Sequence, residues 1–141
     1  MMKRNDFKIL IAEDEPEIRK LYAKAFQAEG YEVVMASTGE QMLAELAESG
    51  FDLLITDMQL DSMSALEVLP DVRKNHPKLP IVVVSGHYTN MAEDFHQKGF
   101  TVDYFFNKPL SLEVLKKTVR TILGIEDAPN NKKKGKSLFK F

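Results

Sequence analysis

Five short apolar runs, separated by longer amphipathic stretches, constrain the fold of this chain more than any other feature of its sequence. They predict strands at 7–12, 32–36, 52–56, 80–84 and 103–106. Most of the runs are rich in β-branched residues and lack the polar alternation of half-exposed strands, so they are typical of strands buried on both faces of a parallel sheet. Five strand–helix alternations then predict right-handed crossovers, with helices on both faces of the sheet.

Capping signals and apolar stripes predict the helices. The first opens at Pro16 and ends at Gly30. Its predicted inward stripe is Ile18, Leu21, Tyr22, Ala25 and Phe26. The second begins at a capping box of Thr38 and Gln41 and stops at Gly50. Its predicted inward residues are Leu43, Leu46 and Ala47.

The three remaining helices follow the last three strands. A second capping box, Ser64 with Glu67, predicts the start of the third helix. Pro70 lacks the donor for an intrahelical hydrogen bond, so it predicts a kink or a short first segment. The fourth helix is expected at 89–98 and the last at 111–123.

Length and composition exclude several classes of protein. A chain of 141 residues predicts one domain, and the absence of cysteine excludes a disulfide framework and a thiolate metal site. No stretch approaches 18 consecutive apolar residues, and the N-terminus lacks the apolar centre of a secretory signal, so a cytoplasmic protein is expected. The net charge of −2 provides no general attraction to nucleic acid, so no sequence-specific nucleic-acid partner is expected.

The charge is unevenly distributed along the chain. Residues 132–141 carry five lysines and no acid, which leaves −7 on the remainder by subtraction from −2. We therefore predict an N-terminal extension at 1–6, a folded domain at 7–124 and a flexible lysine-rich tail at 125–141. The tail ends in two phenylalanines among lysines, which fits an acidic partner or an anionic membrane surface. A solvated, disordered tail is the simpler expectation.

Polar side chains stand at or just past the ends of four of the five apolar runs. They are Glu13 with Asp14, Asp57, Ser85 and Lys108. Open α/β folds place their ligands at the carboxyl ends of the strands, so these distant residues are expected to meet in one crevice. Taken singly, each has a simpler explanation as a cap, a turn former or a solvated side chain. Their joint occurrence at four strand ends favours a shared site.

The chemistry of this set indicates a metal-dependent phosphoryl site. Three carboxylates repel one another unless a cation joins them. An oxygen-only donor set favours a hard metal, with Mg²⁺ as the default. Asp57 directly follows a buried strand, so its carboxylate can serve as metal ligand and as the nucleophile that forms an aspartyl-phosphate. Ser85 and Lys108 would contact the oxygens of the transferred group.

Over residues 7–124 the chain resembles the receiver domain of bacterial two-component response regulators. The matching elements are Glu13-Asp14, Asp57, Ser85-Gly86, Lys108-Pro109 and a Ser-x-Leu-Glu start to the third helix at Ser64. The resemblance implies a flavodoxin-like (βα)5 three-layer sandwich with a parallel five-stranded sheet of order 2-1-3-4-5. It also implies a signalling domain rather than an enzyme, although one able to catalyse its own phosphorylation from small donors and its own dephosphorylation.

The resemblance further implies a role for each matched position. Asp57 would accept the phosphoryl group from a histidine kinase. Asp14 and Asp57 would hold Mg²⁺ directly, together with the backbone carbonyl of Gln59, while Glu13 would act through water. Ser85 and Lys108 would engage the phosphoryl group.

The family's switching positions are matched as well. Phe105 corresponds to the family's switch aromatic, with Tyr104 and Phe106 expected on the opposite face of its strand. Gln59 and His87, two residues after the phosphoacceptor and the hydroxyl, occupy positions that influence the lifetime of the aspartyl-phosphate. A surface role for His87 is an equal alternative. The Lys108–Pro109 peptide bond is cis in that family.

The chain departs from the family pattern in two places. After Asp57, the usual proline is replaced by Asp61 and the usual glycine by Ala65. Asp61 adds a negative charge near the site, which would tune metal affinity, although a solvated loop acid is the simpler interpretation. Residues 99–103 make the approach to the fifth strand about two residues longer than usual.

The leading hypothesis is a stand-alone receiver that switches its fourth-helix, fifth-strand and fifth-helix face to regulate an unknown protein effector. Its phosphoryl donor would be a sensor histidine kinase or a histidine phosphotransfer protein. No output domain is expected after residue 124.

A phosphorelay intermediate, a fragment of a longer regulator and a static, unphosphorylated module are alternatives. A Mg²⁺ phosphatase is disfavoured by Gln59 at the place of a second acid. A flavin binder is disfavoured because no Ser/Thr/Gly-rich loop follows the first strand.

Overall fold

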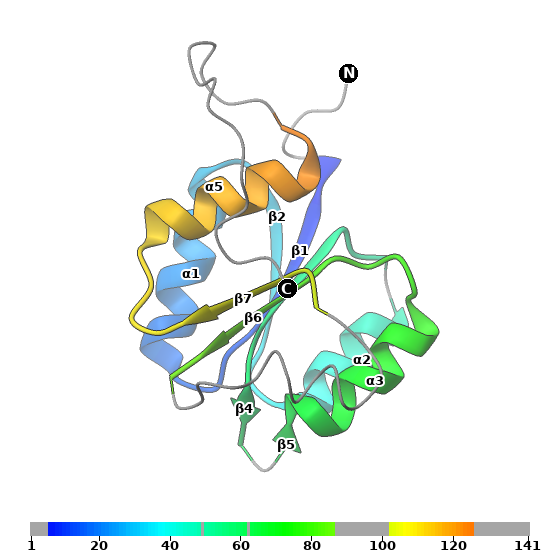
Figure 1. Cartoon of the computed structure of the whole chain (residues 1–141). Coiled ribbons are helices and arrows are strands. Elements are labelled where there is room, and N and C mark those ends of the chain that lie inside the picture. The colour runs from blue at the N-terminus through cyan, green and yellow to red at the C-terminus, as the bar shows by residue number, and fades with distance from the viewer. Residues whose placement is uncertain (1–5, 49, 62, 87–101, 126–141) are drawn as a thin grey trace.

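The central sheet has the predicted topology. The computed structural model describes residues 6–48, 50–61, 63–86 and 102–125. Five parallel strands lie in the order β2-β1-β3-β6-β7 (Figure 1). Their bounds are β1 Lys8–Ala12, β2 Glu32–Ala36, β3 Leu53–Asp57, β6 Ile81–Ser85 and β7 Tyr104–Asn107. Because β6 and β7 are the fourth and fifth strands of this sheet, the order confirms the predicted 2-1-3-4-5 arrangement, and each boundary falls within one residue of its prediction.

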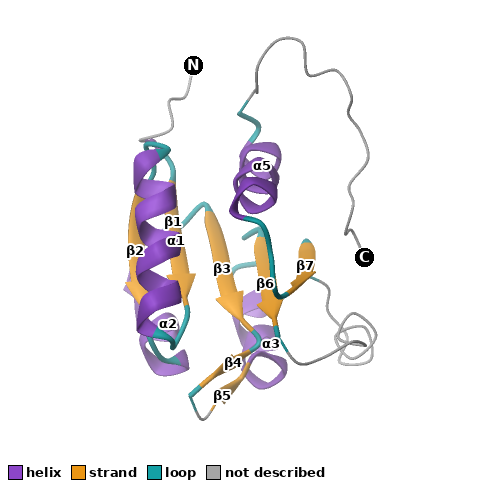
Figure 2. Ribbon diagram, turned by 90° about the vertical axis from the view of Figure 1, so that its left-hand side faces the viewer, coloured by secondary structure: helices purple, strands orange, loops and turns teal. Residues whose placement is uncertain are grey.

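Helices cover both faces of the sheet and complete a three-layer architecture. The described helices are α1 Pro16–Ala28, α2 Gly39–Glu48, α3 Ala65–Asn75 and α5 Leu112–Leu123. α1 and α5 lie on one face, and α2 and α3 lie on the other (Figure 2). The predicted fourth helix, 89–98, lies outside the described residues.

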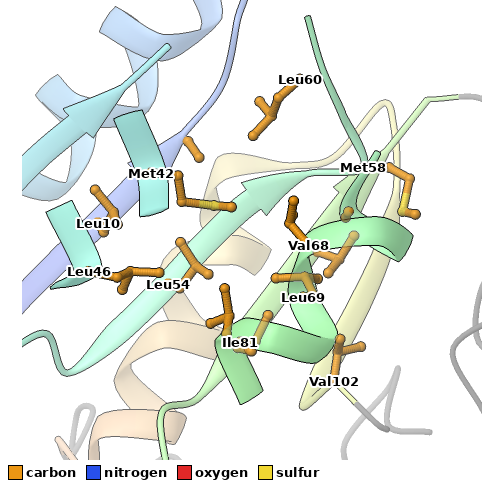
Figure 3. Close-up of a cluster of buried hydrophobic side chains, with 14 of the residues drawn as sticks. Leu10, Met42, Leu46, Leu54, Met58, Leu60, Val68, Leu69, Ile81 and Val102 are labelled. Atoms are coloured by element: carbon orange, nitrogen blue, oxygen red, sulfur yellow. The ribbon is translucent and has the colours of Figure 1, made fainter. Parts of the chain in front are cut away.

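Two hydrophobic clusters hold the layers together. Along β1, Ile9 and Ile11 join the cluster beneath α1 and α5, whereas Leu10 and Ala12 join the cluster beneath α2 and α3. The second cluster is drawn in Figure 3, where Leu54 and Ile81 of neighbouring strands meet side chains from both helices. All four of these β1 residues are buried, which is the physical reason for the unalternating apolar runs.

Local capping follows the sequence signals in most places. Gly30, just after α1, has φ 101°, and Gly124 closes α5 at φ 75°, conformations that glycine adopts without a Cβ penalty. Ser64 Oγ accepts the Leu66 N–H at the start of α3. Thr38 caps α2 as predicted, but the Gln41 side chain accepts from Ser37 rather than from Thr38, so this capping box is displaced by one residue.

Two predictions about inward-facing helix residues are wrong. Leu21 of α1 is 51% exposed, because it lies about 100° around the helix from the buried Tyr22, at the margin of the stripe. Ala47 of α2 is exposed in the same way. α3 continues through Pro70, so the short first segment that was one of the two expectations there does not form, and the kink stays a prediction. Its buried side chains anchor the helix to the sheet on both sides of that proline.

A small antiparallel hairpin, which the sequence did not predict, follows β3. Strands β4 (Gln59–Leu60) and β5 (Met63–Ser64) pair antiparallel, and Asp61, which directly follows β4, has φ 55°. Asp61-Ser62 is not one of the glycine-containing pairs that signal hairpin turns, and two-residue strands are too short to show a period. The hairpin projects beyond the carboxyl ends of the sheet strands (Figure 2).

Candidate functional site

The predicted site residues converge at the carboxyl edge of the sheet. Glu13 and Asp14 directly follow β1, Asp57 is the last residue of β3, Ser85 ends β6 and Lys108 follows β7. Ligand atoms from Glu13, Asp14 and Asp57 all lie within 4.8 Å of one another. Parallel strands of matched length therefore bring together residues that are widely separated in the sequence, as expected for this class of sheet.

Lys108 links two of these carboxylates. Its Nζ lies 3.3 Å from Asp57 Oδ2 and 3.4 Å from Glu13 Oε1, and only 23% of its side chain is exposed. The backbone N–H of Lys108 donates to the Ser85 carbonyl at 2.7 Å, which joins the ends of β6 and β7. The Lys108–Pro109 bond is cis, as the family resemblance implied.

The Asp57 carboxylate is held by donors on both oxygens. The Met58 backbone N–H donates to Oδ1 at 2.7 Å, and the Lys108 ammonium lies beside Oδ2. The Asp57 side chain is 13% exposed, so it is partly accessible to solvent. Two charge-assisted contacts orient this group before any ligand binds.

The charges of the cluster shift the pKa of their neighbours. Burial, followed by the negative charge of Asp57, raises the pKa of Glu13 to about 6, although Lys108 opposes the shift. Burial alone would lower the pKa of Lys108, but the carboxylates of Asp57 and Glu13 outweigh it and raise that pKa. Burial also raises the pKa of Tyr22, a buried residue of α1 next to this cluster.

The donor set of the cluster fits a hard divalent cation. Three carboxylates and one ammonium leave two negative charges in a partly buried crevice (3 − 1 = 2). The donors are all oxygens, which is the preference of Mg²⁺, and no described His or Cys belongs to the group. Burial is the larger cause of the raised pKa of Glu13, and the negative charge of Asp57 adds to it, so a cation bound here would favour the charged form of Glu13.

Sequence reasoning missed two backbone contacts to the cluster. The N–H of Asp61, in the turn of the β4–β5 hairpin, donates to Asp14 Oδ2 at 3.2 Å. Arg19 of α1 donates to the Glu13 backbone carbonyl at 2.9 Å. The first contact could not be predicted because the sequence does not show that Asp61 has a positive φ. The second could not be predicted because the sequence does not show how Arg19 of α1 is oriented relative to the preceding loop.

The remaining predicted residues lie nearby or outside the described part of the chain. Ser85 is buried, and Gln59 is exposed with its side-chain amide donating to the Asp61 carbonyl at 3.3 Å. Phe105 is buried under α3, whereas Phe106 and Tyr104 pack on the opposite face of the sheet, stacked at 6.3 Å between ring centroids. That division confirms the predicted alternation along β7. His87 and the tail residues from 126 onward lie outside the described residues.

The structure describes only part of the two segments in which the chain departs from the family pattern. Ala65 is buried as the first residue of α3, and its N–H donates to the Met58 carbonyl at 2.8 Å. Of the longer segment at 99–103, only Val102 and Asp103 belong to the described residues. Asp103 Oδ2 accepts the Ile81 N–H at 2.7 Å, which fixes the start of β6 against the approach to β7.

A parallel sheet of this order, with an acidic cluster and a lysine at its carboxyl edge, defines a receiver-type signalling domain. Comparison with known families agrees: the family described as the response regulator receiver domain matches residues 9–120. The chain therefore belongs to the receiver family of two-component response regulators. Receiver domains are signalling domains that take phosphoryl groups from sensor histidine kinases.

Curated relatives and solved structures place the chain within this family. It is 32% identical to the sensor kinase CckA of Brucella abortus, with 84% of this chain aligned to 13% of that protein. It is 31% identical to response regulator RR06 of Streptococcus pneumoniae, over 82% of this chain and 52% of that protein. The chain thus spans about half or less of the length of these relatives.

Among solved structures, the response regulator TrrA of Thermotoga maritima, in complex with Mg²⁺–BeF, is similar with a TM-score of 0.73 and 28% identity. The match covers 82% of this chain and 98% of TrrA. The chemotaxis response regulator CheY4 of Vibrio cholerae has a TM-score of 0.72 and 26% identity, over 82% of this chain and 98% of that one. In the part of the chain that the structure describes, no helix has the length and apolar character needed to cross a membrane.

Proposed function

We propose that this chain is a phosphorylation-controlled switch in which Asp57 accepts a phosphoryl group from a sensor histidine kinase or a histidine phosphotransfer protein. One observation carries the proposal: the Asp57 carboxylate lies beside the Lys108 ammonium, within a cluster of three carboxylates, at the carboxyl edge of the sheet. A cytoplasmic location would bring it to the phosphoryl-bearing part of such a kinase.

The transfer itself requires little of the protein beyond positioning and charge neutralisation. A carboxylate oxygen of Asp57 forms a bond to phosphorus while the P–N bond of the donor phosphohistidine breaks. The leaving imidazole keeps the electron pair and takes up a proton. The Lys108 ammonium neutralises charge on the transferred oxygens, and the Ser85 hydroxyl donates a hydrogen bond to one of them.

Mg²⁺ is the cofactor that these residues fit. We assign its binding to Asp14 and Asp57 with the backbone carbonyl of Gln59, and to Glu13 through water. When bound, Mg²⁺ supplies positive charge to the phosphoryl oxygens. The protein's own contribution is to hold the three carboxylates together, with Lys108 fixed to two of them before the ion arrives.

The output of the switch would be a change in the surface formed by β7, α5 and the predicted fourth helix. Phe105 is the proposed switch residue, since it lies on β7 opposite Val83, three residues before Lys108, and is buried on the α3 side of the sheet. The effector would be a protein that recognises this surface. Gln59 and His87 are the proposed determinants of phosphoryl lifetime, and an acidic partner for the lysine-rich tail remains part of the proposal.

A phosphorelay role is the second candidate. It is supported by the similarity to CckA, because in that comparison a receiver-like segment aligns with a small part of a sensor kinase. In that role Asp57 would pass its phosphoryl group on to a histidine phosphotransfer domain, and the same site chemistry would run in both directions.

Intact mass after incubation with acetyl phosphate and Mg²⁺ tests the proposal. We expect one phosphoryl adduct, lost in Asp57→Asn and after EDTA treatment. Asp71→Asn, which alters an exposed aspartate of α3, is the matched control and should keep the adduct. Absence of an adduct from the folded wild type, together with no spectral response to beryllofluoride, would instead indicate a static interaction module.

A further inference from the structure

The β4–β5 hairpin contacts the metal-binding cluster through its backbone. The Asp61 N–H, at the tip of the hairpin, donates to Asp14 Oδ2 at 3.2 Å across 47 positions of sequence. Asp61 is the one described non-glycine residue with positive φ, at 55°. This left-handed conformation carries a steric penalty for an L-residue, and the penalty is smaller for Asp and Asn. The conformation therefore needs support from the surroundings.

The hairpin receives that support from its packing. Leu60 is 2% exposed and belongs to the hydrophobic cluster beneath α2 and α3 (Figure 3). Met63, its cross-strand partner, packs against the same cluster and lies so close to Gly39 that a Cβ there would meet its sulfur. The hairpin is thus held between the start of α2 on one side and Asp14 on the other.

We infer that Asp61 is a positioning residue for the metal site: its left-handed backbone aims an N–H at Asp14 and orients that carboxylate toward Glu13 and Asp57. Oδ2 of Asp14 accepts this bond, and the carboxylate keeps lone pairs on both oxygens for a cation. Outer hydrogen bonds to metal-ligating carboxylates typically change metal affinity by about 10–100-fold when removed. The inference rests on the proposed Mg²⁺-dependent function of the cluster.

Backbone positioning is distinguishable from an effect of the Asp61 charge. Asp61→Asn and Asp61→Gly both remove the charge, but they keep a residue that tolerates positive φ and keep the N–H. Asp61→Val also removes the charge, but a β-branched residue disfavours positive φ, so the turn must change. If the backbone acts, Asn and Gly retain the Mg²⁺ affinity and Val weakens it about tenfold. If the charge acts, all three variants weaken it alike.

A second pair of variants tests the same inference from outside the turn. Gly39→Ala places a Cβ in clash with Met63 Sδ and 3.0 Å from the Met63 Cβ, so the Met63 side chain must repack and β5 must move by a few tenths of an ångström. Gly50→Ala meets nothing within 4 Å and serves as the matched control. We expect Gly39→Ala to weaken Mg²⁺ binding in the same direction as Asp61→Val, and Gly50→Ala to leave it unchanged.

The experiment is a calorimetric Mg²⁺ titration of the full chain and these variants in about 0.15 M salt, where exposed charges are screened. Thermal unfolding of each metal-free variant confirms folding. Amide hydrogen exchange of Asp61 in metal-free protein, with and without Asp14→Ala, tests the hydrogen bond directly and should quicken in that variant. Equal affinity in the Val and Asn variants, or unchanged exchange, would overturn the inference.

The proposed function fails on a different result. A wild type that binds Mg²⁺ with the expected pattern of variants but takes no phosphoryl group on Asp57 would refute phosphorylation and leave the hairpin's role intact. If the wild type is phosphorylated normally but Asp61→Val binds Mg²⁺ as tightly as Asp61→Asn, the hairpin's role is refuted and phosphorylation on Asp57 stands. A wild type that binds no Mg²⁺ would overturn both.

Discussion

Lys108 Nζ lies 3.3 Å from Asp57 Oδ2, although 51 positions separate the two residues in the sequence. The same ammonium lies 3.4 Å from Glu13 Oε1, so one cation is shared by two carboxylates from two other strand ends. This shared ion pair compensates part of the negative charge at the carboxyl edge of the sheet and leaves the remainder for a metal ion.

Removal of the Lys108 charge should separate metal binding from phosphoryl transfer. Lys108→Met makes the net charge of the cluster more negative, from −2 to −3, so Mg²⁺ should bind more tightly. Phosphorylation by acetyl phosphate should slow by about 10²-fold, because the cation that contacts the transferred oxygens is lost. Lys117→Met, at an exposed position of α5, should change neither quantity. Parallel loss of Mg²⁺ affinity and rate would contradict this account.

Neutralisation of Glu13 should stabilise the metal-free protein. Because the pKa of Glu13 rises from 4.5 to about 6 on folding, the native state binds more protons between these values. The free energy of unfolding therefore falls as pH rises across that interval, and the penalty is complete above it. Glu13→Gln mimics the neutral form and should add on the order of 1–2 kcal/mol at about pH 7.5, with the gain vanishing near pH 4.5. Urea unfolding at both pH values tests this, and a gain that is independent of pH would refute it.

Mg²⁺ should raise the melting temperature of the wild type. A ligand that binds only the folded state adds RT ln(1 + [L]/Kd), or about 1.4 kcal/mol at ten times Kd. EDTA should reverse the shift, and Asp14→Ala should abolish it because one of the three carboxylates is lost. Differential scanning fluorimetry with Mg²⁺, and with K⁺ at equal ionic strength, distinguishes site binding from general screening. An equal shift with K⁺ would contradict a specific site.

The buried centre and the exposed margin of the α1 stripe should differ sharply in their contribution to stability. Phe26→Ala removes a fully buried ring and should cost about 3–5 kcal/mol. Leu21→Ala removes a side chain that is 51% exposed and should cost less than about 1 kcal/mol. Chemical denaturation of both variants measures the difference. A large cost at Leu21 would place it against a partner surface or in a different helical phase.

Much of the fold was predictable because burial leaves a direct trace in the sequence. Leu53–Ile55 and Ile81–Val84 are apolar at every position since both faces of their strands are covered, and this pattern located the strands within one residue. The chemistry-bearing residues were predictable for the same reason. Each stands where such a run ends, and parallel strands end at one edge.

The hairpin after β3 was not predictable, because its cause is not local. Gln59–Leu60 and Met63–Ser64 are too short to show a period, and Asp61 is not a strong signal for a left-handed turn. The turn is held by Leu60 in the core, by Met63 against Gly39 and by the bond from Asp61 to Asp14. Each of these contacts joins the hairpin to residues that lie far from it in the sequence.

The sequence by itself determined the layered α/β fold, the strand order implied by its family resemblance, and the set of side chains at the site. Those properties depend on periodicity and on which residues end each strand. Only the tertiary structure decided how the charges are shared, with Lys108 between Asp57 and Glu13, the pKa of Glu13 raised to about 6, and Asp14 tied to a hairpin. Such properties depend on distances of a few ångströms between separate segments, which only packing of the whole domain can set.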